Sequence, residues 1–250
     1  MTLSEQELER YSRQLVLPEW SGEAQERLKA AAVLVVGAGA LGSPVATYLA
    51  AAGVGQIGVV DHDAVELSNL HRQPLHFTPD LGLPKASNAV VKLSALNPEV
   101  HVEQYPVRLD RSNAEPIVMG ADLVVDCSDS FETRYVVNDA CCAQRVPLVE
   151  GGVLGFVSLV MSIRPGESAC YRCAFPTEPV DAPSCREAGV LGAMAGIVGS
   201  IQALEAIKLV AGVGEPLLDT ILHIDGASLA FTRVSTERVA DCPACASQST

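Results

Sequence analysis

Short apolar runs alternate with helix-like stretches over the first two thirds of the chain. Residues 32–36 form an apolar run that ends at a glycine, residues 43–52 follow as a helical pattern, and 57–60 form a second apolar run. A strand, a glycine turn, a helix and another strand make a βαβ unit, so this segment predicts two parallel strands joined by a helix. The alternation continues, with strands expected at 100–107, at 123–127 and from 147 onward, and a helix over 131–144.

The pattern changes near Gly155. Residues 156–163 read as a strand, and the runs 220–224 and 227–234 flank Asp225-Gly226, a dipeptide typical of a hairpin turn. We therefore expect an α/β fold with a Rossmann-like, mostly parallel sheet and antiparallel strands toward the C-terminus, the change falling near residue 155.

A long apolar stretch, 190–213, is interrupted by Gln202, Glu205 and Lys208. These residues recur every third position and make a polar stripe, which predicts an amphipathic or core helix and not a membrane span. The N-terminal residues are acidic and polar and show no apolar signal segment. We expect a cytoplasmic protein whose cysteines stay reduced.

The composition agrees with a parallel sheet, and the net charge disfavours some classes of binding partner. Hydrophobic residues make up 48% of the 250 positions but aromatic residues only 4%, so the core must consist mainly of Ala, Val, Leu and Ile. Seventeen basic against thirty acidic side chains give a net charge of −13. This charge disfavours binding to nucleic acid or to an anionic membrane, although a few local cations could still hold an anionic substrate.

The turn after the first predicted strand fits G-x-G-x-x-G, with Gly37, Gly39 and Gly42 at the glycine positions. Glycines allow a tight turn and close backbone approach, and the helix that follows presents free N–H groups to a phosphate. Asp61 ends the second strand, where an acidic residue usually binds a ribose hydroxyl. These features indicate a nucleotide, NAD being the commonest ligand, although such a turn can also serve packing alone.

A polar cluster extends this interpretation. The segment SNLHRQ contains Arg72, the segment GLPKA contains Lys85, and Asp129 follows a predicted strand in DCSDS. Ligands of open α/β sheets bind beyond the carboxyl ends of the strands, so these groups can converge with the glycine turn. Nucleotidyl transfer uses cations to screen phosphates and a carboxylate to hold Mg²⁺, whereas a dehydrogenase needs neither. Isolated surface charges remain the alternative.

Two C-x-x-C pairs, Cys170/Cys173 and Cys242/Cys245, lie far apart in the sequence. Four thiolates suit tetrahedral Zn²⁺, and we favour a structural Cys₄ site over a redox pair, because neither pair opens a helix in a βαβ unit. Cys185 stands apart in a polar stretch next to an arginine, which favours thiolate; it is either a reactive thiol or an incidental loop cysteine.

The motifs RYSRQ, GAGALG, VVDHD, SNLHRQ, GLPKA and DCSDS together resemble the MoeB/ThiF family, relatives of the ubiquitin-activating enzymes. The resemblance runs from about residue 9 to residue 245, with the motifs in the family's order. Two departures stand out: Ala40 replaces a frequent glycine, and Ser130 replaces a frequent asparagine, which leaves the contact of residue 130 open.

The resemblance implies a reaction in which ATP adenylates the C-terminal glycine of a small ubiquitin-like sulfur carrier that ends in Gly-Gly, with release of pyrophosphate. It implies catalytic roles for Arg13, Arg72, Lys85, Asp129 and Cys185, with Arg13 entering the site of the partner subunit in a homodimer. Asp129 would carry Mg²⁺, and Cys185 would form a covalent bond with the carrier in some relatives. The implied nucleotide-binding residues are Gly37, Gly39, Ala40, Gly42, Asp61, Ser68, Asn69, Leu70, His71, Arg72, Lys85, Asp129 and Ser130.

We therefore expect one adenylation domain with an N-terminal helical segment (1–31), a nucleotide-binding core (32–155) and an antiparallel, zinc-binding part (156–250). Because the chain stops at residue 250, we expect the sulfur to come from a separate donor, a sulfurtransferase or desulfurase, for molybdopterin, thiamine or related metabolism. The alternatives are an NAD(P)-dependent oxidoreductase, a noncatalytic ubiquitin-fold binding module, and a relative that adenylates modified tRNA.

Overall fold

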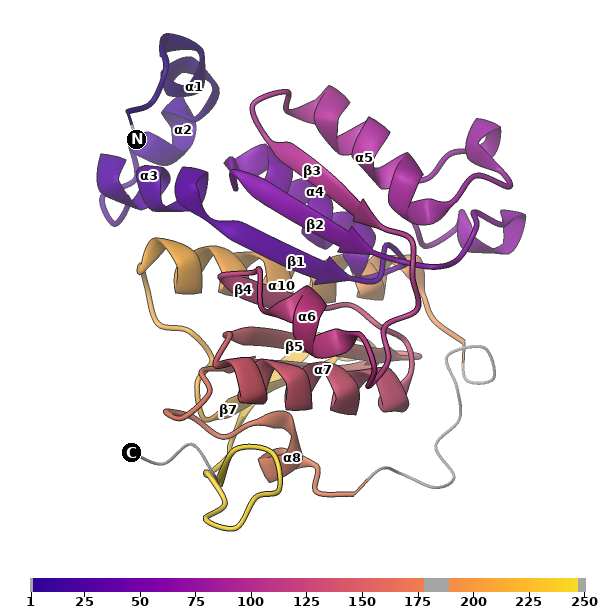
Figure 1. Ribbon diagram of the computed structural model, residues 1–250, viewed down its shortest axis with the longest axis vertical. Helices are drawn as coiled ribbons and strands as arrows, with labels where there is room; N and C mark the ends of the chain where they lie inside the picture. Colours follow the sequence, from indigo (N-terminus) through magenta and orange to yellow (C-terminus); the bar gives the residue numbers. More distant parts are fainter. Residues whose placement is uncertain (1, 178–188, 247–250) are drawn as a thin grey trace.

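A single twisted sheet of eight strands organises the computed structural model, which describes residues 2–177 and 189–246 (Figure 1). The strand order is β3-β2-β1-β4-β5-β6-β7-β8. The strands are β1 (Ala32–Val36), β2 (Gln56–Val60), β3 (His101–Tyr105), β4 (Leu123–Asp126), β5 (Leu148–Leu154), β6 (Val157–Ile163), β7 (Thr220–Asp225) and β8 (Ala230–Ser235). Strands β1 to β5 pair in parallel and β6 to β8 pair antiparallel, so the expected change of direction falls between Leu154 and Val157.

Helices cover both faces of the parallel part (Figure 1). The helices are α1 (Glu5–Arg10), α2 (Ser12–Leu15), α3 (Gly22–Ala30), α4 (Gly42–Ala52), α5 (Lys85–Leu96), α6 (Ala114–Val118), α7 (Phe131–Gln144), α8 (Tyr171–Ala174) and α10 (Gly192–Ala211), with 3₁₀ turns η1 (Leu67–Asn69) and η2 (Thr78–Asp80). Helices α3, α4, α5 and α10 contribute to one core cluster, whereas α6 and α7 contribute to the other.

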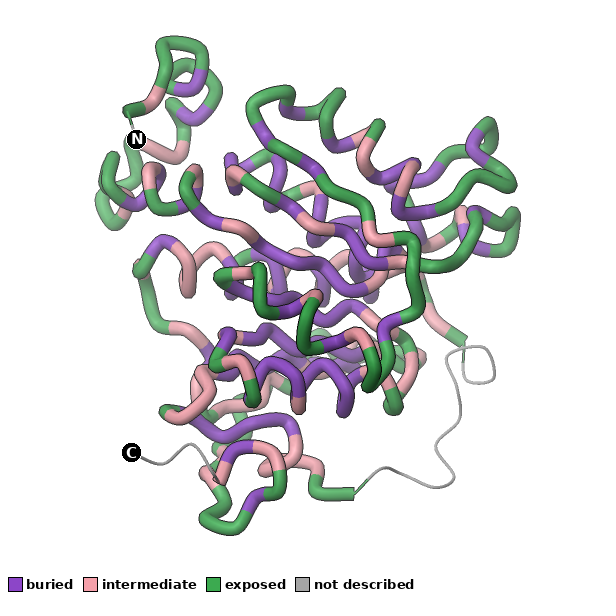
Figure 2. Tube along the Cα trace, viewed as in Figure 1, coloured by how far each residue is buried: buried purple, intermediate pink, exposed green. Residues whose placement is uncertain are grey.

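Strand β1 shows why the sheet needs cover on both sides. Val33 and Val35 belong to the core with α4 and α10, and the alternate residues Leu34 and Val36 belong to the core with α6 and α7. Successive side chains of a strand point to opposite faces, so a strand buried on both faces reads as a continuous apolar run. Figure 2 shows that the central strands are buried and that exposed residues lie toward the outside of the molecule. The predicted α/β fold class is confirmed.

The hairpin near the C-terminus differs from the prediction. Asp225 still pairs with Ala230, so residues 226–229 form a four-residue loop and the second strand begins three residues later than expected. The Asp225 carboxylate stabilises this loop, because it accepts hydrogen bonds from Ala227 N–H (2.9 Å) and from the Ser228 hydroxyl (2.7 Å).

Helix α10 is a core helix whose polar stripe faces inward. Gln202 donates to the main-chain oxygen of Asp126 (2.6 Å), and Glu205 accepts from the Ser162 hydroxyl (2.7 Å). In the described parts of the chain, α10 is the one helix long and apolar enough to cross a membrane. Its buried apolar residues pack instead in the core with α3, α4 and α5, and its buried polar residues are hydrogen-bonded to the sheet.

Candidate active site

The glycine turn joins three elements by close backbone contact. Gly37 has a φ of +97°, and a Cβ there would lie 2.9 Å from the Cys127 carbonyl oxygen at the end of β4. A Cβ at Gly42 would lie only 1.8 Å from the Gly37 carbonyl oxygen. Both positions therefore need glycine, and the N-terminus of α4 is held against the carboxyl ends of β1 and β4.

Asp61 closes the turn from the neighbouring strand β2. One of its oxygens accepts a hydrogen bond from Ala38 N–H (2.8 Å), and the other accepts from Asp63 N–H (2.8 Å). Each carboxylate oxygen can accept a second hydrogen bond. Asp61 thus has the geometry to hold the turn and still accept from a ligand hydroxyl.

A cleft of about 480 Å³ opens at this edge of the sheet, beyond the ends of β1, β2 and β4. Its volume is that of a small-molecule or cofactor site. The cleft brings together nine of the predicted residues, namely Gly37, Gly39, Ala40, Asp61, Asn69, Arg72, Lys85, Asp129 and Ser130. The predicted residues Gly42, Ser68, Leu70 and His71 do not line it: Gly42 begins α4, and the other three lie in the adjoining loop.

Lys85 is a buried cation on the wall of the cleft. It is the first residue of α5, and its ammonium group contacts the half-exposed carboxylate of Asp63 at 3.0 Å. A buried ammonium needs a partner, and here the partner faces solvent. An anion that enters the cleft can therefore displace Asp63 as the partner of Lys85, or bind the Lys85 ammonium together with Asp63.

The loop after β2 supplies the other predicted polar groups. Asn69 is buried, and its side-chain oxygen accepts from Glu66 N–H (3.2 Å). Arg72 donates to the Ser68 carbonyl oxygen (2.7 Å) and contacts the His71 ring. These local bonds fix the Arg72 guanidinium beside the cleft, while His71 remains exposed and orients Arg72.

Asp129 and Ser130 lie where β4 leads into α7. Asp129 is exposed and lines the cleft, so its carboxylate oxygens are accessible to a molecule that enters it. The Ser130 hydroxyl accepts from Thr133 N–H (3.2 Å) and so caps α7. A helix cap explains a short polar side chain at residue 130.

A buried ion pair supports this loop from below. Arg134, on α7, pairs with Glu150 of β5 and donates to the carbonyl oxygens of Gly151 (2.8 Å) and Ser128 (3.0 Å). Burial and the nearby Asp126 raise the pKa of Glu150 well above its usual value, whereas the charge of Arg134 and its hydrogen bond oppose this shift. The bond to Ser128 anchors the residue directly before Asp129. Sequence reasoning missed Arg134, because its partners lie on separate elements and leave no motif.

Arg13 lies away from this cleft. It is an exposed residue of α2, and its neighbour Gln14 donates to the carbonyl oxygen of Ala52, the last residue of α4. Helix α4 starts at the cleft and its eleven residues extend roughly 16 Å from it. A single chain therefore does not bring Arg13 to the other predicted site residues.

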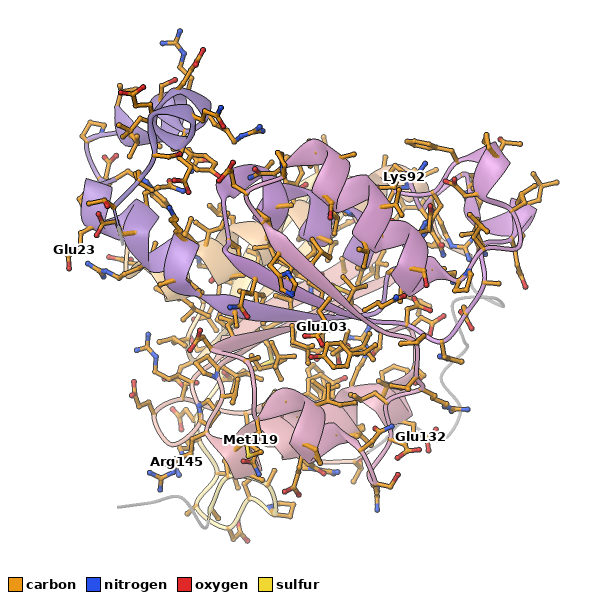
Figure 3. All side chains as sticks on the ribbon, turned by 45° about the horizontal axis from the view of Figure 1, so that its top comes forward. Glu23, Lys92, Glu103, Met119, Glu132 and Arg145 are labelled. Carbon is orange, nitrogen blue, oxygen red and sulfur yellow. The ribbon has the colours of Figure 1, made fainter. Side chains whose placement is uncertain are left out.

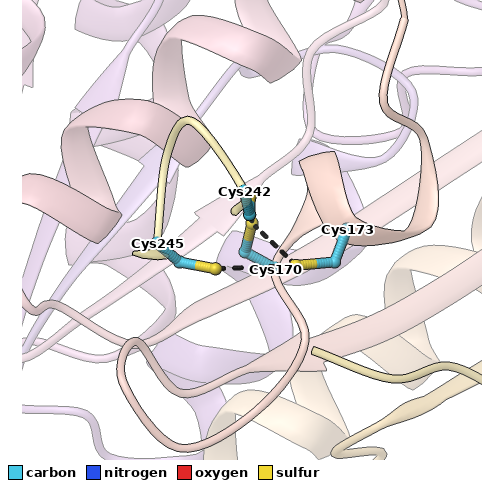
Figure 4. A group of neighbouring side chains, drawn as sticks. All are labelled: Cys170, Cys173, Cys242 and Cys245. Atoms are coloured by element: carbon cyan, nitrogen blue, oxygen red, sulfur yellow. Dashed lines mark hydrogen bonds between the residues drawn. The ribbon is translucent and has the colours of Figure 1, made fainter. Parts of the chain in front are cut away.

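The four cysteines of the C-x-x-C pairs meet beside α8 (Figure 4). Neighbouring sulfur atoms lie 3.7 Å apart (Cys170–Cys173), 3.6 Å apart (Cys170–Cys242) and 3.5 Å apart (Cys173–Cys245). A tetrahedral site with Zn–S bonds of about 2.3 Å needs sulfur atoms about 3.8 Å apart. The cluster therefore fits a Cys₄ zinc site, as the two pairs predicted. Cys185 lies outside the described residues.

Comparison with known proteins identifies relatives over nearly the whole chain. The model of the ThiF family matches residues 11–244. A sulfur carrier protein adenylyltransferase from Thermus thermophilus is 48% identical over all of this chain and 95% of its own. The SAMP-activating enzyme E1 from Haloferax volcanii is 45% identical over 98% of this chain and 91% of its own. An adenylyltransferase and sulfurtransferase MOCS3 from Drosophila grimshawi is 46% identical, and this chain spans 56% of its length.

Solved structures share the fold. Escherichia coli MccB with ATP superposes with a TM-score of 0.85 at 24% identity, over 94% of this chain and 74% of that one. Selenomethionine PaaA superposes with a TM-score of 0.75 at 25% identity, over 95% of this chain and 76% of that one.

Proposed function

Because the chain belongs to the ThiF family and its cleft gathers the family's polar groups, we propose that it is an adenylyltransferase for a sulfur carrier. In this reaction ATP transfers its adenylyl group to the C-terminal glycine carboxylate of a ubiquitin-like carrier and releases pyrophosphate. The names of the relatives from Thermus thermophilus and Haloferax volcanii support this substrate class.

The position of Lys85 is the main support for this proposal. Lys85 is buried on the wall of the cleft and paired with the half-exposed Asp63. Together with Arg72, which lies in the loop that leads to α5, it provides positive charge for a triphosphate. A carboxylate is a poor electrophile at neutral pH, and an acyl-adenylate gives it a leaving group. This step needs alignment and charge stabilisation, and no covalent nucleophile from the protein.

We assign the nucleotide parts to the cleft as follows. The glycine turn and the start of α4 face the phosphates, and Asp61 faces the ribose. Asn69, Arg72 and Lys85, which also line the cleft, would hold the phosphates. Asp129 would hold Mg²⁺, which prefers carboxylate oxygens and, when bound, neutralises phosphate charge.

We also propose that the four-cysteine cluster holds a structural Zn²⁺. It would tie the C-terminal tail to α8, where Arg238 already donates to the carbonyl oxygens of Gly166 (2.9 Å) and Cys245 (2.8 Å). The protein would act in the cytoplasm, where cysteines stay reduced and can serve as metal ligands.

Three further features belong to the proposal. The enzyme would act as a homodimer in which Arg13 enters the partner's site, since Arg13 lies far from the cleft of its own chain. A separate sulfur donor would convert the carrier adenylate to a thiocarboxylate. Cys185 would be the residue that bonds covalently to the carrier.

ATP–pyrophosphate exchange with a panel of purified sulfur carriers tests the function. Exchange is expected with at least one carrier and to vanish when its Gly-Gly end is removed. Lys85→Ala and Asp129→Ala should each abolish carrier-dependent exchange, whereas Lys29→Ala, a lysine paired with Glu7 away from the cleft, should retain it.

Full exchange by either cleft variant contradicts the assigned roles. Nicotinamide binding with a spectral change and no exchange would favour the oxidoreductase instead. Carrier binding without turnover would favour a noncatalytic binding module.

A further inference from the structure

The buried side chain of His76 contacts the glycine turn from inside the protein. Its Nε2 atom lies 2.9 Å from the Ala38 carbonyl oxygen. A carbonyl oxygen only accepts hydrogen bonds, so Nε2 must carry the hydrogen. His76 therefore donates to the backbone of the turn that faces the cleft.

The second ring nitrogen is held by a chain of polar groups. The side-chain nitrogen of Asn88 lies 2.8 Å from His76 Nδ1 and donates to the Asp80 carboxylate at 3.1 Å. The Asp80 carboxylate in turn accepts a hydrogen bond from Phe77 N–H (2.7 Å) and forms an ion pair with the Lys92 ammonium (3.1 Å). Lys92 lies on α5 and is labelled in Figure 3.

This chain sets the tautomer of His76. A carboxylate accepts only, so the amide nitrogen of Asn88 must face Asp80, and its other hydrogen points at His76 Nδ1. Nδ1 then accepts, and the imidazole is neutral with its hydrogen on Nε2. Burial lowers the pKa of His76 below its ordinary value, which agrees with a neutral ring.

The contact between His76 and the Ala38 carbonyl oxygen also sets the direction of the Gly39 N–H, which belongs to the same peptide bond. In a planar trans peptide the C=O and the next N–H point in opposite directions. Because the Ala38 C=O points inward to His76, Gly39 N–H points away from it, and Gly39 lines the cleft. Within residues 2–177 and 189–246, Gly39 N–H has no hydrogen-bond partner.

We propose that His76 is a positioning residue that holds Gly39 N–H toward the phosphates of the bound nucleotide. The preceding Ala38 N–H is already held by Asp61, so two successive peptides of the turn are fixed from two sides. This inference rests on the proposed function and extends it. The His76 hydrogen bond would fix the orientation of the glycine turn before ATP binds.

Replacing His76 tests the proposal. His76→Leu removes the donor and keeps an apolar side chain, whereas the amide of His76→Gln can still donate from near the Nε2 position. His76→Leu should weaken ATP binding and raise the KM for ATP about tenfold, the effect of one misplaced hydrogen bond, with the KM for the carrier unchanged. His76→Gln should restore values close to those of the wild type.

Asn97→Leu is the matched control. Asn97 is also buried and donates two hydrogen bonds, to the Tyr11 hydroxyl (2.8 Å) and the Ala50 carbonyl oxygen (2.7 Å), at the end of α4 far from the cleft. It should lower the melting temperature and leave ATP binding unchanged. If His76→Leu behaves in the same way, or if His76→Gln gives no rescue, the positioning role is wrong.

Nitrogen NMR of wild-type protein with labelled histidine gives a test that does not depend on a folded variant. A neutral His76 with its hydrogen on Nε2 supports the proposal, and either the other tautomer or a protonated ring at pH 7 overturns it. ATP binding can be measured by calorimetry without a carrier. The role of His76 can therefore be refuted even if the exchange assay succeeds, and it can be supported even if no carrier gives exchange.

Discussion

The Ser130 side chain lies both on the wall of the cleft and at the start of α7. Its hydroxyl satisfies Thr133 N–H, one of the free donors of the first helical turn. The same position thus shapes the loop that carries Asp129 and stabilises the helix behind it. Only a substitution of Ser130 that still caps α7 can test the role of this side chain in the cleft separately from its role in stability.

Ser130→Ala should lower the free energy of unfolding by about 1 kcal/mol, because the cap is lost. Ser130→Asn should keep the wild-type stability, since asparagine caps helices as well as serine does. Urea denaturation of the two variants measures the difference. Equal loss of stability in both would show that the Ser130–Thr133 bond does not stabilise α7.

Lys85 shows what a sequence pattern can and cannot reveal at this scale. Its place in GLPKA marks it as a candidate phosphate ligand. Its ion pair with Asp63 depends on how the loop between β2 and α5 folds back, and no spacing rule predicts that contact. Buried polar pairs such as Arg134 with Glu150 escape sequence analysis for the same reason.

Gly199 lets helix α10 pack closely against α4. A Cβ at Gly199 would lie 2.5 Å from Pro44 Cγ and 2.7 Å from the Leu41 carbonyl oxygen, at the start of α4. Nothing lies within 4 Å of a Cβ at Gly196. Gly199 therefore needs to lack a side chain, whereas Gly196 does not, although both lie in the same helix.

Gly199→Ala should destabilise the protein by about 2 kcal/mol, because the new methyl group forces α10 away from α4. Gly196→Ala should be neutral or stabilise it by up to about 1 kcal/mol, since alanine favours a helix over glycine. Chemical denaturation compares the two. A Gly199→Ala variant as stable as Gly196→Ala would contradict the close packing of α4 and α10.

The four-cysteine cluster links elements that are about seventy residues apart in the chain. The purified protein should contain one zinc per chain, and Cys245→Ser should lose it together with more than about 3 kcal/mol of stability, beyond the usual range for one substitution. Cys141→Ala, which changes a buried cysteine of α7 outside the cluster, should keep the metal. Elemental analysis with thermal unfolding measures both. Zinc-free wild-type protein would contradict the site.

Elements were predictable where one local signal dominates. The strands β1 and β2 are continuous apolar runs because both faces are buried, and the glycine turn between β1 and α4 follows from its spacing. The last hairpin was misplaced because the Asp225 side chain bonds its own loop and lengthens it. Helix α5 went unpredicted, since it begins directly after Pro84 without a side-chain cap.

If Arg13 acts in the site of the partner subunit, each site is complete only in a dimer. Arg13→Ala and Lys85→Ala should then each be inactive alone. Mixing and refolding them should restore about a quarter of the wild-type exchange rate, because half of the dimers are mixed and each has one intact site. No recovery, with mixed dimers shown by mass spectrometry, would place Arg13 outside the partner's site.

We propose that the cleft beyond β1, β2 and β4 transfers an adenylyl group from ATP to a protein tail. Intact-mass spectrometry of a sulfur carrier incubated with the enzyme, ATP and Mg²⁺ measures this transfer directly. We predict that the carrier gains one adenylyl group on its terminal glycine, and that Lys85→Ala enzyme leaves the carrier mass unchanged. Transfer that persists with Lys85→Ala, or a carrier that never gains mass while ATP is bound, would contradict the claim.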